Sequence, residues 1–163
     1  MLDLDVSFEA SGGTPTRSVF ISYRRGSETL DQWVCGLADD LSNAGLDVQL
    51  DQWIRNPSGG WGPWSRRGIE TSNFVLSVCT PGYRAAFDQT EGEEGKGVHW
   101  EGHYIEQCLY EARAQNDRFI PILLEDGSEL DIPGPLRGGT FYRLPHDADA
   151  LLTRLLAQSD CDD

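Results

Sequence analysis

The segment SVFISY, residues 18–23, decides the fold of this chain. It is a short, nearly continuous apolar run with β-branched residues, which is the pattern of a strand buried on both faces of a parallel sheet. Similar runs follow at DVQLD (47–51), NFVLSVCT (73–80) and RFIPILL (118–124), and a shorter one at TFYRL (140–144). The sequence therefore predicts five strands.

Helical patterns separate these runs. After the first strand, Thr29 and Gln32 have the spacing of a capping box, and Gly45 suits the end of a helix. Between them lies an apolar stripe with helical spacing, formed by Trp33, Val34, Leu37, Ala38 and Leu41. We also expect a short helix at 61–71 and a last helix at about 147–157.

Strands that alternate with helices form right-handed βαβ units and a mainly parallel sheet covered by helices. Five such strands suggest an α/β fold of the flavodoxin-like order 2-1-3-4-5. Ligands of such sheets bind beyond the carboxyl ends of the strands, where the winding switches between strands 1 and 3. Two loops meet at that point. One begins at Tyr23-Arg24-Arg25, and the other begins at Thr80 and leads toward Glu101.

The 163 residues are enough for one domain with a hydrophobic core. We expect a flexible leader at 1–17, the domain at 18–157 and an acidic tail at 158–163. The formal net charge of −14 argues against binding to nucleic acids or anionic membranes, because both need surfaces rich in Lys and Arg. No apolar run is long enough for a membrane span, and the N-terminus lacks the pattern of a signal peptide.

Metal binding and disulfides are not expected. The cysteines lack metal-site spacing, and we interpret those within apolar patterns as buried free thiols of a cytoplasmic protein. The four are Cys35, Cys79, Cys108 and Cys161. His99 and His103 are four residues apart, but Glu101 lies two residues from each, unlike the H-E-x-x-H pattern of zinc proteases. No third ligand is evident.

The segment GKGVHWEGHYIEQCLYE, residues 95–111, contains a candidate catalytic acid. Its apolar stripe has helical spacing and consists of Ile105, Cys108, Leu109 and Ala112. Glu101 lies four residues before Ile105, so we expect it in the first helical turn, on the inward face beside the crevice. Glu106 should lean toward solvent. The alternative is an ordinary acid that suits the N-terminal end of the helix dipole.

The order of the motifs resembles a known family. VFISYRRGS (19–27) is similar to the first box of Toll/interleukin-receptor (TIR) domains, especially those that cleave NAD⁺. The later segments DVQLDQW, GWGPWSRRGIETSNFVLSVCTPGY, GKGVHWEG, RFIPILL and IPGPLRG resemble the bacterial SEFIR/TIR-like subgroup. The resemblance covers about residues 18–156 and implies a flavodoxin-like fold.

The resemblance also implies an activity and its residues. TIR enzymes cleave the nicotinamide–ribose bond of NAD⁺, and many bacterial ones act in antiphage defence. Their key glutamate follows a tryptophan at the start of the helix after strand 3, which implies Glu101 as the catalytic residue. The enzymes usually have W-x-x-x-E, whereas here Trp100 directly precedes Glu101, as in the W-E-G of the bacterial subgroup. Glu106 is the second choice.

Substrate-binding residues follow from the same resemblance. The adjacent Arg24 and Arg25 match arginines that line the NAD⁺ pocket, and planar guanidinium groups suit a pyrophosphate. The loop that contains Asp51 and Trp53 corresponds to a loop over the substrate. Aromatic rings could stack on nicotinamide or adenine, and the candidates are Tyr23, Trp53 and Trp100. No cofactor is expected, since NAD⁺ is the substrate.

One carboxylate suffices for this chemistry, because nicotinamide is a cationic leaving group that needs no protonation. Bond breaking builds positive charge on the ribose, which a preplaced carboxylate stabilises. Either ADP-ribose or a cyclic product would result. The competing function is a non-catalytic adaptor that binds like domains. The expected partners are therefore NAD⁺, further TIR-type domains through self-association, and a sensor domain or partner protein.

Overall fold

The computed structural model describes residues 17–25, 27–55, 57, 59–88, 96–111 and 118–157, with side chains from Glu101 onward in the fourth helix. The expected flexible leader, apart from Arg17, and the acidic tail lie outside these residues. Arg17 belongs to the fold, because its carbonyl accepts a hydrogen bond from the Asp47 amide at 2.9 Å.

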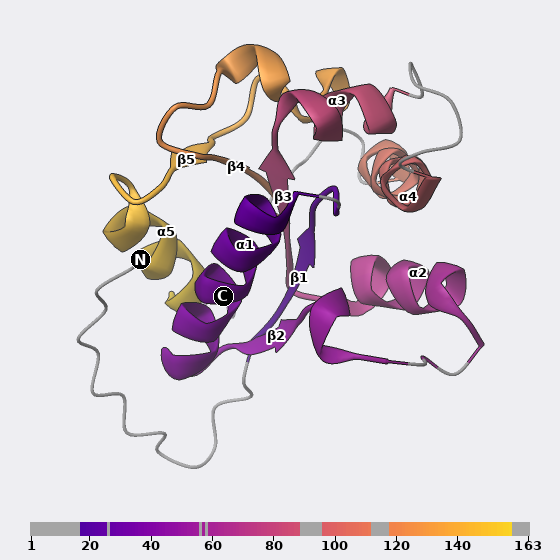
Figure 1. Ribbon diagram of the computed structural model, residues 1–163, viewed down its shortest axis with the longest axis horizontal. Coiled ribbons are helices and arrows are strands. Elements are labelled where there is room, and N and C mark those ends of the chain that lie inside the picture. Colours follow the sequence, from indigo (N-terminus) through magenta and orange to yellow (C-terminus); the bar gives the residue numbers. More distant parts are fainter. Residues whose placement is uncertain are drawn as a thin grey trace.

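Five parallel strands form one sheet in the order β2-β1-β3-β4-β5, which confirms the predicted flavodoxin-like fold (Figure 1). The strands are β1 (Ser18–Ser22), β2 (Asp47–Gln49), β3 (Phe74–Cys79), β4 (Phe119–Leu123) and β5 (Tyr142–Arg143). In β3 and β4 every residue is buried, because helices cover both faces of the sheet. The winding switches between β1 and β3, as predicted.

Two layers of helices cover the sheet. They are α1 (Glu28–Asn43), α2 (Trp61–Thr71), α3 (Pro81–Phe87), α4 (Lys96–Glu111) and α5 (Ala148–Leu156). Short 3₁₀ turns lie at η1 (Asp51–Trp53), η2 (Glu129–Asp131) and η3 (Gly134–Leu136). Helices α1 and α5 share one core cluster with alternate strand residues, and α2, α3 and α4 share the other (Figure 1). Residues of β1 therefore point alternately into two different cores.

The start of α1 differs from the prediction. The side chain of Ser27, not Thr29, accepts the hydrogen bond of the first turn, from the Leu30 amide at 3.3 Å. Serine is a preferred N-cap residue because its oxygen satisfies an amide that has no partner within the helix. The predicted end is confirmed, since Gly45 follows the helix with a φ of +100°.

Helix α3 was not predicted, and α4 begins earlier in the chain than predicted. Thr80 caps α3 by accepting a hydrogen bond from the Tyr83 amide at 3.0 Å, and Pro81 occupies the first helical position. Helix α4 begins at Lys96, within residues 88–97, whose polar, Gly-rich sequence predicts a loop. Glu101 therefore lies in the second turn of α4, and the prediction of a first-turn position was wrong.

The described cysteines are free, but only Cys79 is fully buried, while Cys35 and Cys108 are half-buried. Cys161 lies outside the described residues. Across the described part of the chain, no helix combines the length and the apolar content needed to cross a bilayer.

Candidate active site

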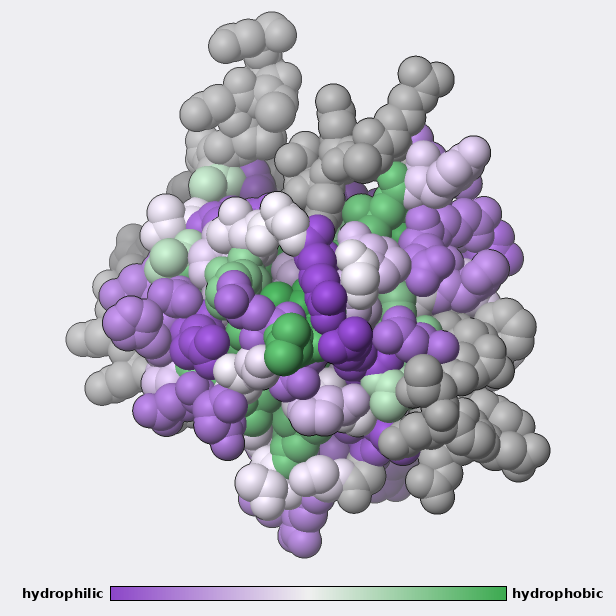
Figure 2. Space-filling view, turned by 90° about the horizontal axis from the view of Figure 1, so that it is seen from above, coloured by the Kyte–Doolittle hydropathy of each residue, from purple (hydrophilic) through white to green (hydrophobic). Residues whose placement is uncertain are grey.

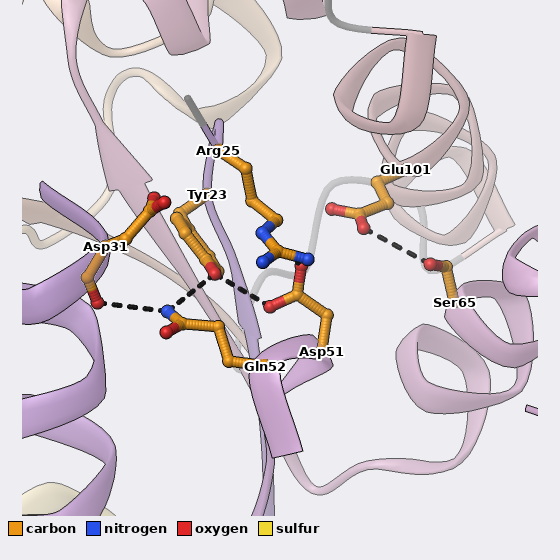
Figure 3. A network of polar contacts seen from close by, with 7 residues as sticks. All are labelled: Tyr23, Arg25, Asp31, Asp51, Gln52, Ser65 and Glu101. Atoms are coloured by element: carbon orange, nitrogen blue, oxygen red, sulfur yellow. Dashed lines mark hydrogen bonds and ion pairs between the residues drawn. The ribbon is translucent and has the colours of Figure 1, made fainter. Parts of the chain in front are cut away.

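Both carboxylate oxygens of Glu101 accept hydrogen bonds from serine hydroxyls. Ser22, the last residue of β1, donates to Oε2 at 2.5 Å. Ser65 of α2 donates to Oε1 at 3.2 Å (Figure 3). The carboxylate therefore points inward from α4 into the space between α2 and the carboxyl end of β1, at the switch point of the sheet. The prediction of an inward direction is confirmed, and Glu106 is exposed as expected.

A glycine next to Glu101 allows α4 to pack closely. A Cβ atom at Gly102 would lie 2.9 Å from the ring of Phe87 in α3, which is closer than side chains tolerate. Glycine at this position lets the two helices approach one another. The glycine of the W-E-G motif thus helps to set the distance between α3 and α4, and with it the position of the Glu101 backbone.

The environment of Glu101 raises the pKa of its carboxyl group, so that the group is about half-ionised at neutral pH. The pKa of Glu101 is raised to about 7. Burial is the largest cause, and the negative charge of Asp51 also raises the pKa. The hydrogen bonds from Ser22 and Ser65 act in the opposite direction and lower it. Burial dominates because the charged form loses its hydration. A carboxyl group whose pKa is shifted this far is typical of functional sites.

A second polar cluster fastens the turn η1 to β1 and α1 (Figure 3). The Tyr23 hydroxyl donates to Asp51 Oδ1 at 2.8 Å. The Gln52 amide nitrogen donates to the Tyr23 oxygen at 2.7 Å and to the Asp31 carbonyl at 3.0 Å. Burial raises the pKa of Asp51, while the Tyr23 hydrogen bond and the charge of Arg25 lower it. These bonds fix the start of the loop that follows β2.

The ring of Tyr23 does not offer the expected stacking surface. Only 5% of the residue is exposed, and its ring belongs to the core cluster on the α1 side of the sheet. The reason is strand alternation, since Ser22 faces the side of Glu101 and the next residue must face the other side. Tyr23 instead contributes through its hydroxyl group, which holds Asp51.

The two adjacent arginines diverge. The Arg24 guanidinium donates to the Gly82 carbonyl of α3 at 3.2 Å. The Arg25 side chain, 54% exposed, places its Nε 3.7 Å from Asp51 Oδ2 (Figure 3). An ion pair as open as this one is weak and can be exchanged for another anion. Arg25 is thus the arginine that the structure brings close to the Asp51 carboxylate.

Tryptophans lie on both sides of the loop after β2. Trp53 is 43% exposed on η1, and Trp61 is 44% exposed at the start of α2. Trp61 packs edge-on against Trp64, which in turn lies against Phe20, so Trp64 is a packing residue. The side chain of Trp100 lies outside the described residues. Figure 2 looks onto the carboxyl edge of the sheet, where small apolar groups are bordered by hydrophilic residues.

Sequence reasoning missed three residues around Glu101. From the sequence, Ser22 at the end of a strand is expected to satisfy local backbone groups, but its hydroxyl contacts Glu101 and the Tyr83 hydroxyl, the latter at 2.8 Å. Ser65 was not singled out, although it precedes the buried Gly68 and Ile69 at helical spacing, which was the available signal. Within the described residues, no three His, Cys, Asp or Glu side chains converge as a metal site.

The comparisons with known proteins agree with this architecture. The family model of the SEFIR domain matches residues 17–155. A crystal structure of a prokaryotic SEFIR domain has 24% sequence identity and a TM-score of 0.63, and covers 88% of this chain and 100% of that chain. The SEFIR domain of IL-17 receptor B has 16% identity and a TM-score of 0.61, covering 87% and 96%. A search of curated proteins gives no match. The chain therefore belongs to the SEFIR domain family, with the TIR-like fold that its motifs predict.

Proposed function

We propose that this SEFIR domain is an NAD⁺ glycohydrolase that breaks the bond between nicotinamide and ribose. The observation that carries the proposal is the Glu101 carboxylate, held by two serine hydroxyls at the switch point of the sheet with a pKa of about 7. Acids of this kind mark functional sites, and this one occupies the position where ligands of doubly wound sheets bind.

In the proposed reaction the bond between C1′ of the ribose and N1 of the pyridinium breaks, and its electron pair goes to the nicotinamide nitrogen. The ribose ring acquires oxocarbenium character, and the ionised Glu101 stabilises the positive charge. Water then adds to C1′ and loses a proton, which gives ADP-ribose. Attack by the adenine of the same molecule gives a cyclic form instead. Neutral nicotinamide leaves without an acid catalyst, so one carboxylate is sufficient.

Arg25 and Trp53 are the proposed substrate contacts. Arg25 is more than half exposed, and its partner Asp51 is a single carboxylate at 3.7 Å that a pyrophosphate can replace. Trp53 offers a partly exposed ring on the neighbouring turn. In this proposal Tyr23 and Asp51 hold the loop in place, and Arg24 supports the approach of α3 through its hydrogen bond to Gly82.

The test is direct. The purified chain is incubated with NAD⁺ over a range of protein concentrations, and nicotinamide release is followed by chromatography. We expect the rate of nicotinamide release to rise more steeply than in proportion to protein concentration. TIR enzymes act as assemblies, and the resemblance implies the same for this chain. Absence of nicotinamide from a sample shown by sedimentation to be assembled would refute the glycohydrolase proposal. The wider role as an antiphage effector, joined to a sensor domain or a partner protein, depends on this activity.

The second candidate is a non-catalytic module that binds like domains. The observation in its favour is the pair of partly exposed tryptophans, Trp53 and Trp61, on either side of the loop after β2. Aromatic residues of this kind are enriched in protein interfaces. If they form the contact, a Trp61→Ala variant should sediment as a monomer at concentrations at which the unchanged chain self-associates. An unchanged sedimentation profile would place the contact elsewhere.

The rate of NAD⁺ cleavage should depend on pH through Glu101. The catalytic form is the carboxylate, and the pKa of Glu101 is about 7, so the rate should rise with pH and level off above about 8. Below the midpoint the rate should fall about tenfold for each pH unit, as expected for one ionising group. The measurement is kcat/KM for nicotinamide release between pH 5 and pH 9. A rate that falls as pH rises through 7 would contradict the role of an ionised Glu101.

A further inference from the structure

We propose that Ser22 is a positioning residue for Glu101 and that the Tyr83 hydroxyl fixes the direction in which Ser22 donates its hydrogen. The hydrogen-bond relay runs from Tyr83 through Ser22 to Glu101. Its catalytic meaning rests on the proposed function. Its physical content, the ionisation and orientation of Glu101, concerns the free protein and can be measured without any substrate.

The direction of the relay follows from counting hydrogens. Ser22 Oγ contacts both Glu101 Oε2, at 2.5 Å, and the Tyr83 oxygen, at 2.8 Å. A serine hydroxyl has one hydrogen, and an ionised carboxylate can only accept. When Glu101 is ionised, Ser22 must therefore donate to it, and Tyr83 must donate to Ser22. Burial raises the pKa of the Tyr83 hydroxyl, so it stays protonated and remains a donor.

The relay is rigid because both hydroxyl groups belong to the core. Ser22 and Tyr83 are 0% exposed. Ser22 lies at the end of the interior strand β1, and Tyr83 lies in the first turn of α3. Three segments far apart in the sequence, β1, α3 and α4, therefore meet through these oxygens. Hydrogen bonds in such low-dielectric surroundings are stronger than in water, and each bond in a chain polarises the next.

Charged and titratable groups reach Glu101 from other elements as well. Asp51 of η1 disfavours ionisation, and Arg25 balances that charge through its ion pair with Asp51. From α2, Ser65 donates to the other carboxylate oxygen at 3.2 Å. Of the two serine bonds, that of Ser22 is the shorter and has the larger effect on the pKa of Glu101. Ser22 is therefore the main donor that favours the carboxylate form.

The test is a pH titration of the Glu101 side-chain carboxyl carbon by ¹³C NMR in the free protein. The signal is assigned by its loss in Glu101→Gln. In Ser22→Ala the midpoint should move upward by about one pH unit, the effect of losing one hydrogen bond to a charged group. Tyr83→Phe should move it in the same direction by less. The matched control is Ser72→Ala, which removes another buried serine hydroxyl, 3% exposed and without a hydrogen-bond partner among the described residues.

An unchanged midpoint in a folded Ser22→Ala variant would overturn the inference. If that variant does not fold, Tyr83→Phe decides, and an unchanged or lower midpoint would overturn it equally. In the assay of nicotinamide release, Ser22→Ala should shift the pH profile upward by the same amount and lower the rate at pH 7 about fivefold, in line with the smaller ionised fraction. If the unchanged chain releases no nicotinamide, the proposed function fails while the NMR shift still tests the relay.

Discussion

Replacing Glu101 by Gln should lower kcat for nicotinamide release by at least about 100-fold, the range found when a preplaced electrostatic group is removed. Gln has the same shape. Its amide oxygen can accept a hydrogen bond from one of the two serines, Ser22 or Ser65, while its NH2 group can donate to the hydroxyl oxygen of the other. What disappears is the negative charge that stabilises the ribosyl cation. The measurement is the initial rate at pH 8, where the unchanged Glu101 is ionised.

Glu106→Gln is the matched control for this substitution. It makes the same chemical change on the same helix, five positions along, at a side chain that is exposed to solvent. Its activity should stay within about twofold of the unchanged chain, because surface substitutions of this kind have small effects. If Glu106→Gln abolished activity and Glu101→Gln did not, the catalytic acid would be Glu106, and the contacts of Glu101 with Ser22 and Ser65 would have another role.

The stability of the Glu101→Gln variant gives an independent check. The pKa of Glu101 in the folded protein is raised above its ordinary value of 4.5, to about 7. The folded state therefore favours the protonated form, and its contribution to stability is present at low pH and is lost as pH rises through 7. Glutamine cannot ionise, so the variant should be at least as stable as the unchanged chain at pH 8. A loss of activity in a variant with an undiminished melting temperature is then a catalytic effect.

Most of the fold could be predicted because the signals that define it are local. Each central strand is a short apolar run, since both faces of a parallel sheet are buried, and such a run is visible without knowledge of its neighbours. Helix α3 was not predicted, because its seven residues are too few to show an apolar stripe with helical spacing. Only the Thr80-Pro81 pair marked its start, as an N-cap followed by a first-turn proline.

The candidate site could be predicted only in part, because its partners come from distant segments. The apolar stripe of α4 gives the direction of Glu101, and this was correct. The serine partners are 79 and 36 residues away in sequence, and nothing in the local pattern of either segment indicates a carboxylate neighbour. Tyr23 is a different case. Because successive strand residues face opposite sides, the sequence did contain the information that Tyr23 and Ser22 cannot share one crevice.

The substitution Gly68→Ala should lower the melting temperature by about 2 to 12 °C, from an overpacking cost of about 1–3 kcal/mol at this chain length. A Cβ atom at Gly68 would lie 2.3 Å from the ring of Phe20, and 3.3 Å from the side-chain oxygen of Gln49. The ring cannot swing away, because Phe20 is 0% exposed in the interior strand β1 and Trp64 lies against it. Helix α2 must therefore move outward from β1.

The matched control is Gly62→Ala in the same helix, where an added Cβ meets no atom within 4 Å. Alanine favours helix by up to about 1 kcal/mol over glycine, so this variant should keep or raise the melting temperature. A Gly68→Ala protein as stable as the unchanged chain would mean that α2 does not pack on Phe20 as closely as described.

The outward shift of α2 also has a consequence for the candidate active site. Ser65 lies one turn before Gly68, so the same substitution should lengthen its 3.2 Å bond to Glu101 and raise the pKa of that group. Packing between α2 and β1 and the ionisation of Glu101 are thus coupled through a single glycine.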